Sequence, residues 1–520
     1  MTKLRLICSL LILPLFVQPA HLASAADSFA AATLLSGNNA TNTDTNASAT
    51  TEAGEPTYGI NSTAFRSLWW KWTPDANGRA QVDLTGSADS PVVGSTTFGK
   101  YLGVYIAKGN SPAVNSLALV HSSGGQTSAT PNVTFPAAAG TTYYLHVTSE
   151  APSEYGSIKI NASLDTSSDI GGLNVQGQAR FANDSFAQRI ALTGASVSAI
   201  GYNLSATVEP GEPTLGSHTL WWSWTAPSTG RVTVSSAGSD TEFQKTMTVL
   251  EGSTLSSLIG IQQYVSNVSS YMPSLTFPVT SGKTYQIALG STASSDGGSF
   301  VLGISLSTNT DINQLNINTE ATGMNDLFGN RIRLSGSAVS SIGYGAFGTL
   351  EPLEPGATGG GSLWWTYTPT AAGTVSLATA GSNTYYNKYL TVWTGNALSS
   401  LSQVARSSNT SLPSVSFAAV AGQTYQISVG ASSLSVTPGD VVLSLAGPAG
   451  LVATPLSGLT IDNAVRLRWT ALLGTTYQIR SSNNLQTWTN VGAPIIGDGG
   501  VKEVYQPITD SARFYRVVPQ

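Results

Sequence analysis

The chain has 520 residues, of which 41% are hydrophobic and 10% are charged, and its formal net charge is −5. The apolar fraction is enough for packed cores, so the composition excludes an intrinsically disordered chain. No basic segment accompanies the slight acidity, which argues against a nucleic-acid-binding protein. At roughly 150 residues per domain, the length predicts three or four domains.

Residues 1–25 predict a secretory signal peptide. Lys3 and Arg5 precede an apolar run over residues 6–17, and residues 23–25 (Ala-Ser-Ala) form a small-x-small cleavage site. We therefore expect a secreted or cell-surface protein. The apolar run is too short to span a membrane, and no later run reaches about 18 apolar residues, so no integral membrane segment is expected after cleavage. The single cysteine lies in the signal peptide, so no disulfide is expected in the mature chain.

The rest of the sequence repeats one unit three times. Leu-Trp-Trp at residues 68–70 returns at 220–222 and 363–365, and each copy carries a later Gly-x-Thr-Tyr. A period of about 140 residues is much longer than a solenoid unit, so each copy is expected to be a whole domain, and the array to resemble beads on a string. The predicted domains after the signal peptide are repeat 1 at 26–165, repeat 2 at 166–308, repeat 3 at 309–446 and a different C-terminal domain at 447–520.

One polar tract in repeat 1 resembles a disordered segment. Residues 36–56 are rich in Asn, Thr, Ser and Ala, but they align without a gap to residues 193–213 and 335–355. The alignment predicts an ordered segment, such as a long loop.

The local pattern is typical of β-structure throughout. Runs of Val, Ile, Leu, Tyr and Thr alternate with Ser and Gly between turn residues, and no segment keeps a helical period. About eight strands per copy predict an all-β protein with three tandem β-sandwich domains of jelly-roll-like topology. Residues 447–520 lack Leu-Trp-Trp, and their short strands predict a smaller immunoglobulin- or fibronectin-III-like β domain.

The order of motifs in repeat 2 carries a family resemblance. The motifs are NDSF at 183–186, GYNLSATVEPGEP at 201–213, LWWSWTAPSTGRVTV at 220–234 and FPVTSGKTYQIAL at 277–289. Residues 27–446 resemble the bacterial pre-peptidase C-terminal-like (PPC-like) β-sandwich repeats found beside secreted enzymes and on surface proteins.

The C-terminal domain resembles a second family. Residues 485–488 and 514–517 are similar to C-terminal modules of large secreted proteins from Verrucomicrobia-like bacteria. Both resemblances imply accessory binding or surface display. Repeat 1 departs from the PPC-like pattern, because its EPGEP segment reads Glu52 to Pro56 as EAGEP.

The sequence offers no catalytic motif. HExxH, GxSxG and P-loop spacings are absent, and His121 and His218 have no acidic or histidine companion nearby in the sequence. We therefore expect a protein that binds and does not catalyse. A Ser-His-Asp triad assembled in space stays open as an alternative, because its members need not be close in sequence.

The tryptophan strand supplies the candidate ligand-binding residues. Strand alternation places Leu68, Trp70 and Trp72 on one apolar face, which should be core. The opposite face then carries Trp69, Trp221 and Trp364 in the three copies. An exposed indole could stack on a sugar ring or anchor a protein, whereas a covering loop would make it part of the core.

Pairs of glutamates three residues apart supply the candidate metal ligands. The pairs are Glu52 and Glu55, Glu209 and Glu212, and Glu351 and Glu354. Two carboxylates on a loop suit calcium, a hard cation that prefers oxygen ligands. The alternative is that they cap backbone N–H groups or pair with the recurring Lys100, Lys245 and Lys388. No other cofactor is expected.

The first hypothesis is therefore a non-catalytic binding or adhesion protein that recognises carbohydrate or extracellular matrix through repeated weak sites. The second is a structural spacer or display protein whose C-terminal domain anchors or sorts it. The third is a secreted hydrolase with an unrecognised site.

Overall fold

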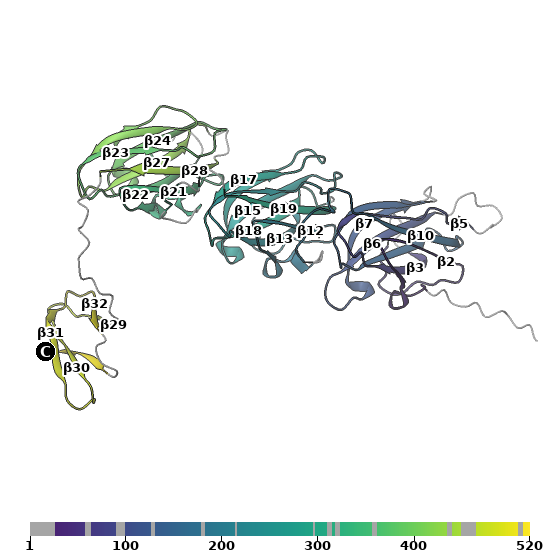
Figure 1. The fold of residues 1–520 in the computed structure, drawn as a ribbon, viewed down its shortest axis with the longest axis horizontal. Helices are drawn as coiled ribbons and strands as arrows, with labels where there is room; N and C mark the ends of the chain where they lie inside the picture. Colours follow the sequence, from purple (N-terminus) through teal and green to yellow (C-terminus); the bar gives the residue numbers. More distant parts are fainter. Residues whose placement is uncertain are drawn as a thin grey trace, which may run out of the picture. The chain divides into compact units, whose positions relative to one another are not determined.

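The computed structural model describes residues 26–57, 64–89, 99–125, 130–177, 182–213, 216–294, 297–308, 312, 315–317, 323–355, 361–433, 439–448, 464–507 and 513–520. The predicted signal peptide lies outside these residues. The chain divides into two compact units, Met1–Gly450 and Leu451–Gln520 (Figure 1). No helix in the described part of the chain is long and apolar enough to cross a membrane. The all-β fold predicted from the sequence is confirmed.

Unit 1 contains three similar modules, each built from two sheets. In module 1 the first sheet has the order β1-β3-β9-β6-β7 and the second β2-β10-β4-β8, with β5 paired to β10. The strands are β1 (Thr33–Leu35), β2 (Asn39–Thr45), β3 (Phe65–Trp72), β4 (Gly78–Asp83), β5 (Ala88–Asp89), β6 (Lys100–Ala107), β7 (Leu117–Gly125), β8 (Asn132–Ala137), β9 (Tyr143–Ser149) and β10 (Gly156–Asp165).

Modules 2 and 3 repeat this arrangement. Their sheets run β11-β13-β18-β15-β16 with β12-β19-β14-β17, and β20-β22-β27-β24-β25 with β21-β28-β23-β26. The strands of module 2 are β11 (Ile190–Leu192), β12 (Ser196–Tyr202), β13 (Ser217–Thr225), β14 (Gly230–Ser235), β15 (Lys245–Glu251), β16 (Ile259–Val265), β17 (Ser274–Val279), β18 (Thr284–Ser291) and β19 (Ser299–Ser307). Those of module 3 are β20 (Ile332–Leu334), β21 (Ala338–Tyr344), β22 (Ser362–Tyr367), β23 (Gly373–Ala378), β24 (Lys388–Thr394), β25 (Ser402–Arg406), β26 (Ser414–Ala419), β27 (Tyr425–Ala431) and β28 (Asp440–Ala446).

The strand order is that of a jelly roll. If the eight main strands of a module are numbered along the chain, the two sheets read 1-8-3-6 and 2-7-4-5, which is the order of two interleaved Greek keys. A ninth, short strand adds to the tryptophan strand in parallel, with Thr33 opposite Trp70 in module 1. The predicted jelly-roll topology is therefore confirmed in all three modules.

Short 3-10 helices connect or flank the strands. They are η1 (Phe29–Ala31), η2 (Val114–Ser116), η3 (Ala182–Asp184), η4 (Phe186–Gln188), η5 (Leu255–Ser257), η7 (Met324–Asp326), η8 (Phe328–Asn330) and η9 (Leu398–Ser400). The helices η1, η4 and η8 occupy the same place in the three modules, just before the short parallel strand.

The inner faces of the two sheets form the core of each module. Leu68, Trp70 and Trp72 are fully buried in it, as strand alternation predicted. One apolar cluster runs without a break through modules 1 and 2 and includes Tyr344 and Val442 of module 3. The three modules are thus packed against each other, and the expectation of independent beads on a string is wrong.

The polar tract of repeat 1 is ordered. Residues 39–45 form β2, whose residues alternate between exposed and half-buried, and which pairs with β10 over its whole length. The equivalent strands β12 and β21 are buried at six of seven positions. The polar side chains of β2 therefore lie at a strand that is partly exposed, whereas the more apolar β12 and β21 are covered.

Unit 2 is a small two-sheet domain. Its sheets are β29-β32 and β31-β30-β33, built from β29 (Ala464–Thr470), β30 (Thr476–Ser482), β31 (Thr489–Ile496), β32 (Val501–Pro507) and β33 (Phe514–Pro519). Its interior is small, with Ala471, Tyr477 and Ile479 buried, while Leu472 and Leu473 are exposed.

Candidate functional site

The three candidate tryptophans are buried. Trp69 and Trp221 are 0% exposed and Trp364 is 1% exposed. A sugar ring can stack only on an accessible indole face, so the prediction that these residues form ligand-binding platforms is wrong. The physical reason is that the sheet has a second apolar layer on its outer face, which the sequence alternation alone did not show.

That second layer is a small aromatic cluster in each module. The ring of the phenylalanine in the 3-10 helix meets the indole edge-on, at 5.2 Å for Phe29 and Trp69, 5.0 Å for Phe186 and Trp221, and 5.1 Å for Phe328 and Trp364. Edge-to-face pairs of this kind are worth about 0.5–1.5 kcal/mol beyond the burial of their area. The tryptophans therefore stabilise the outer layer of the sandwich.

The glutamate pairs hold this layer in place. The first member of each pair accepts a hydrogen bond from the backbone N–H of the covering phenylalanine, at 2.6 Å for Glu52, 2.6 Å for Glu209 and 2.5 Å for Glu351. The second member accepts from the indole N–H, at 3.1 Å for Glu55 with Trp69 and 2.7 Å for Glu212 with Trp221. In module 3 the carboxylate of Glu354 accepts from the backbone N–H of Glu351 at 3.1 Å.

These contacts correspond to the capping alternative. The carboxylates face N–H donors, which would also face any cation placed between them, so the geometry does not favour the predicted calcium site. No group of three or more His, Cys, Asp or Glu side chains that could hold a metal ion occurs within the described ranges. Burial raises the pKa of Glu212 and of Glu354, and the hydrogen bond from Trp221 opposes this rise at Glu212.

Two of the recurring lysines, Lys245 and Lys388, bind backbone carbonyls and not these glutamates. Lys245 Nζ donates to the carbonyls of Phe243 and Ser269 at 2.8 and 3.0 Å, and Lys388 Nζ donates to the carbonyl of Ser411 at 2.7 Å. Burial lowers the pKa of Lys245 and of Lys388 to about 8. These lysines bind loop carbonyls inside the modules, so the suggestion that they neutralise the glutamates is wrong.

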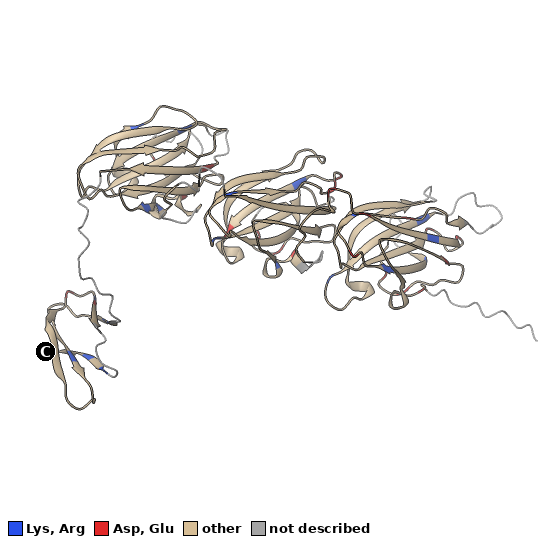
Figure 2. Ribbon diagram, in the orientation of Figure 1, with Lys and Arg blue, Asp and Glu red and all other residues tan. Residues whose placement is uncertain are grey.

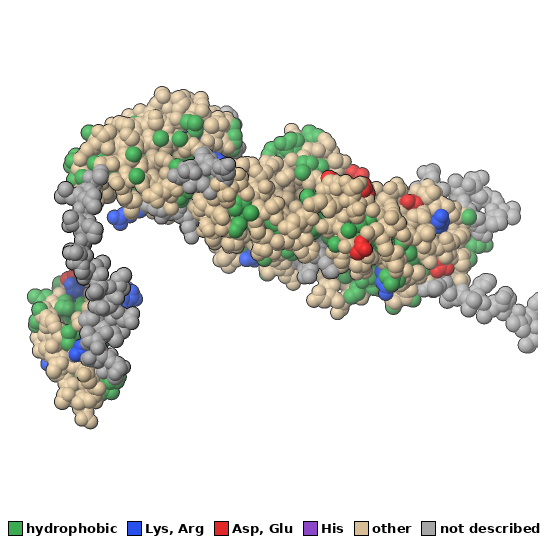
Figure 3. All heavy atoms as spheres, in the orientation of Figure 1, with side chains coloured by type: hydrophobic (Ala, Val, Ile, Leu, Met, Phe, Trp, Pro, Cys, Tyr) green, Lys and Arg blue, Asp and Glu red, His purple; other side chains and the backbone are tan. Residues whose placement is uncertain are grey.

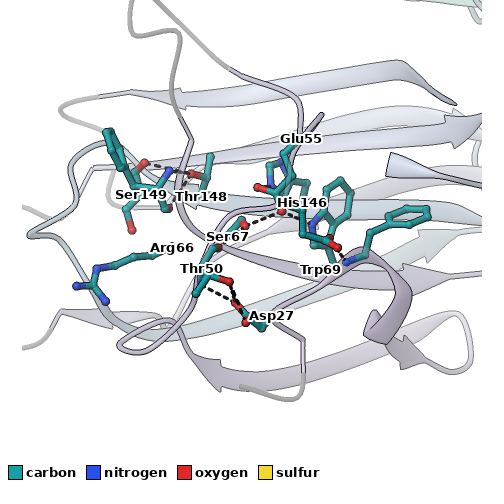
Figure 4. A network of polar contacts seen from close by, with 12 residues as sticks. Asp27, Thr50, Glu55, Arg66, Ser67, Trp69, His146, Thr148 and Ser149 are labelled. Atoms are coloured by element: carbon teal, nitrogen blue, oxygen red, sulfur yellow. Dashed lines mark hydrogen bonds and ion pairs between the residues drawn. The ribbon is translucent and has the colours of Figure 1, made fainter. Parts of the chain in front are cut away.

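An aspartate at the start of each module completes the outer layer. Asp27, Asp184 and Asp326 accept hydrogen bonds from the backbone N–H of Thr50, Thr207 and Thr349, at 2.6, 2.7 and 2.7 Å. Figure 4 shows this contact in module 1 beside Glu55, Trp69 and His146. The constant spacing of 23 residues to a threonine is the sequence signal that could have predicted the long-range contact.

Module 1 differs from the others by a buried histidine. His146 stacks on Trp69 with ring centroids 4.1 Å apart, and its Nε2 lies 3.8 Å from Oε2 of Glu55 (Figure 4). Burial lowers the pKa of His146, which the nearby carboxylate of Glu55 opposes. Because both side chains are almost completely buried, this pair is part of the core.

The other two histidines in the described part of the chain are His121 and His218. His121 Nε2 lies 3.5 Å from Glu242 of module 2, and His218 Nδ1 lies 3.5 Å from the hydroxyl of Ser291. Ser291 is 0% exposed. A substrate could not reach this hydroxyl, so the geometry gives no support to the hydrolase alternative.

The modules meet at two junctions in the described part of unit 1, and buried side-chain hydrogen bonds cross each of them. At the first (junction 1/2), the hydroxyls of Tyr143 and Tyr202 lie 2.8 Å apart, and Tyr202 donates to the carbonyl of Pro136 at 2.7 Å. Both tyrosines are 0% exposed. Burial raises the pKa of Tyr143 to about 12, so these phenols stay protonated and can keep donating.

Junction 2/3 repeats this contact. The hydroxyls of Tyr285 and Tyr344 lie 3.2 Å apart, and Tyr344 donates to the carbonyl of Pro278 at 2.7 Å. Phe277 packs its ring edge against Tyr344, with centroids 6.2 Å apart. Modules 2 and 3 thus each insert the last residue of their first main strand, Tyr202 of β12 or Tyr344 of β21, into the end of the module before them.

An arginine crosses each junction as well. Arg79 binds Asp169 through two 3.1 Å contacts and donates to the carbonyl of Gly238 in module 2 at 2.7 Å. Arg231 donates in the same way to Gly381 of module 3, and its guanidinium lies 3.6 Å from Asp440. Burial raises the pKa of Asp440 to about 6, although the charge of Arg231 acts in the opposite direction.

The charged residues are otherwise sparse. Figure 2 shows that the described Lys, Arg, Asp and Glu residues are scattered over the strands and loops, and the face in Figure 3 is mostly uncharged. The face shown in Figure 3 therefore lacks the charge density that steers strongly charged ligands.

A groove in module 2 lies beside junction 2/3. Arg189, Ser253 and Ser256 line it together with Lys283 and the half-exposed Met324. Arg189 lies over the ring of Phe186 at 4.2 Å and donates to its carbonyl. Lys283 forms an ion pair with Glu251. Sequence reasoning missed this groove because its residues come from segments that are far apart in the sequence.

No protein-family model matches the chain, and no curated protein is significantly similar to it. The resemblance to PPC-like repeats therefore stays a prediction. Among solved structures, the CUB1-EGF-CUB2 domains of rat MASP-1 are 10% identical and cover 53% of this chain and 99% of their own, with a TM-score of 0.15. A triple jelly-roll protein of an archaeal virus is 10% identical over 74% of this chain and 83% of its own, with a TM-score of 0.17. At such TM-scores these likenesses carry no argument about function.

Proposed function

We propose that this chain is an exported, non-catalytic spacer or display protein, in which three interlocked jelly-roll modules carry the small C-terminal β domain. The observation that supports this proposal best is the tyrosine contact that recurs at both junctions. A flexible string of binding modules has no need of a buried Tyr-Tyr-Pro contact between its members. A spacer of fixed geometry does, because a fixed distance requires junctions that resist bending.

The burial of apolar residues at the junctions indicates how far the modules can move relative to each other. The apolar cluster continues across junction 1/2 and includes the linker residue Ile170, which is 0% exposed, and the same holds for Ile312 before module 3. Interfaces between domains that are small and polar usually permit relative motion, whereas buried apolar interfaces restrict it. The continuous core therefore favours fixed junctions.

The distribution of polar residues also favours a chain of defined length. Thr45 stands in β2 where Tyr202 and Tyr344 stand in the later modules, so module 1 carries no residue for insertion into a preceding module. Terminal members of repeat arrays are expected to have such a polar outer face.

Small-angle X-ray scattering of the full chain, compared with Tyr202→Ala and Tyr344→Ala, tests the spacer function. Unit 1 should scatter as one body in the wild type, and each variant should add flexibility at its own junction. Wild-type scattering that requires independently moving modules would refute the proposal. The role of the C-terminal domain as an anchor or sorting signal is tested by deleting residues 447–520 and locating the protein in cell fractions. Unchanged localisation would contradict that role.

A second candidate function is polysaccharide binding in the groove of module 2, which the exposed Met324 and the serine-rich loop with Arg189 favour. Titration calorimetry with alginate and hyaluronan, on the wild type and on Arg189→Ala, tests it. Binding that the substitution weakens would support this function, and no heat with either polymer would contradict it.

A further inference from the structure

At both junctions a large residue of one module packs against a small residue of the next, but the large residue comes from the preceding module at junction 1/2 and from the following module at junction 2/3. At junction 1/2 the large residue is Leu119 of module 1, whose backbone N–H donates to the hydroxyl of the small Ser205 at 3.0 Å. At junction 2/3 the large residue is Phe347 of module 3, which lies against Gly260 of module 2. A Cβ atom at Gly260 would come within 2.0 Å of the Phe347 ring.

These positions are equivalent in the two modules. Leu119 pairs with Tyr105 next to the bulge between β6 and β7, and Gly260 pairs with Leu250 next to the same bulge between β15 and β16. Ser205 and Phe347 both follow the inserted tyrosine by three residues. Large and small residues have therefore changed sides between the junctions.

The buried acid of each junction has changed place too. In module 2 the acid is Asp240, on the loop that pairs with Ser299, and its Oδ2 accepts from the N–H of Ser299 at 2.7 Å. In module 3 the equivalent loop residue is Asn383, and the acid stands opposite it as Asp440. At this paired position each junction thus places an acid near the arginine of the preceding module, on the loop at junction 1/2 and on β28 at junction 2/3, while Asp169 is a further acid on Arg79.

We propose that each junction is specific for its own pair of modules, so that module 3 accepts module 2 and rejects module 1. This inference rests on the fixed junctions of the proposed function and deepens it. If modules 1 and 3 met, the side chain of Leu119 would occupy the space that Phe347 fills at Gly260. Even a Cβ atom at Gly260 would overlap the ring of Phe347, so a larger residue fits there only if the Phe347 ring leaves this space and gives up its packing.

Specificity of this kind has a physical use in a repeat protein. Tandem modules of similar sequence misassemble by pairing with the wrong neighbour, within a chain or between chains. Rejection of wrong partners by a clash is an effective way to obtain discrimination from interfaces that are otherwise alike. Four residues thereby determine the order of the modules: Leu119, Ser205, Gly260 and Phe347.

The test measures the distance between modules 2 and 3 in the full chain. Spin labels are placed at Asn267→Cys and Asn396→Cys, which are exposed, in a chain whose native cysteine is replaced by Cys8→Ser. Double electron–electron resonance should give one narrow distance. The substitution Gly260→Leu should abolish that single distance, and the double variant Gly260→Leu with Phe347→Ser, which recreates the arrangement of junction 1/2, should restore it.

Gly329→Leu is the matched control, since an added Cβ at Gly329 meets no atom within 4 Å, and it should leave the distance unchanged. The reciprocal experiment measures the distance across junction 1/2, with one label at the exposed Asn110→Cys of module 1 and the other at Asn267→Cys. Ser205→Phe should disrupt this junction, and Leu119→Gly combined with Ser205→Phe should repair it. Ser205 lies in a loop, so this pair reports on the junction even if Gly260→Leu fails to fold.

The outcomes separate the inference from the function on which it rests. A broad distance in the wild type would overturn the fixed spacer itself. A narrow wild-type distance that Gly260→Leu leaves unchanged, or single and double variants that behave alike at both junctions, would overturn the specificity and leave the spacer intact.

Discussion

Replacement of Trp221 by alanine tests whether the tryptophan of the outer layer is structural. The indole is fully buried, packs against Phe186 and donates to Glu212 at 2.7 Å. A tryptophan buries roughly 200–250 Å², which at about 25 cal/mol per Å² corresponds to an upper estimate of about 5–6 kcal/mol. Measured losses for such truncations are about 3–5 kcal/mol, and the carboxylate of Glu212 would also lose its donor. We therefore expect Trp221→Ala to lower the local free energy of unfolding of module 2 by about 3–5 kcal/mol.

Hydrogen exchange measured by mass spectrometry on the full chain is the appropriate assay, because it reports each module separately and does not assume two-state unfolding of the whole chain. Glu212→Gln keeps the volume and an oxygen acceptor, and should cost only about 1 kcal/mol. Tyr385→Ala, at a side chain that is 65% exposed, serves as the control and should change exchange in module 3 by less than about 0.5 kcal/mol. A loss below about 1 kcal/mol for Trp221→Ala would refute the structural role and return the residue to the ligand-binding hypothesis.

Three further predictions follow from single contacts. His218 has a φ of 51°, a left-handed conformation that strains a non-glycine residue, and module 3 has Gly361 at the same position. His218→Gly should therefore raise the free energy of unfolding by about 1 kcal/mol in a denaturant titration. A lower free energy of unfolding would contradict the strain at His218. The folded-state pKa of Asp440 is raised from 3.8 to about 6, so the folded protein binds more protons and stability should fall as the pH rises from about 4 to about 6. Two pKa units correspond to about 3 kcal/mol, and Asp440→Asn should remove this slope from pH-dependent unfolding curves, whereas an unchanged slope would refute the assignment. Tyr344→Phe loses the hydrogen bond to Pro278 and should destabilise module 3 by about 1–2 kcal/mol in hydrogen exchange, and unchanged protection would show that the contact contributes nothing.

The two junctions are filled by different pairs of residues, and this difference indicates which contacts all modules share and which are specific to one junction. Leu119 with Ser205 and Gly260 with Phe347 fill the same space with different partners, whereas the tyrosine contact is repeated without change. The repeated contact supplies the attraction that all modules share. The exchanged residues supply the difference that distinguishes one junction from the other.

The sequence by itself determined the class of fold and the face of the tryptophan strand that forms the core. Alternation with a period of two identifies which side chains share a face, so Leu68, Trp70 and Trp72 could be placed correctly. The repeat alignment also predicted that residues 36–56 are ordered despite their polar composition. These features are local or periodic, and such patterns are readable along the chain.

Only the tertiary structure decided what covers the opposite face and where the modules meet. Burial of Trp69, Trp221 and Trp364 depends on a phenylalanine and two carboxylates brought from elsewhere in the chain, and periodicity carries no information about such partners. The junction residues have the composition of ordinary loops and strand ends. Their role arises because folding brings Tyr202 to Pro136 and Phe347 to Gly260, contacts between residues more than 60 positions apart that are set by packing in three dimensions.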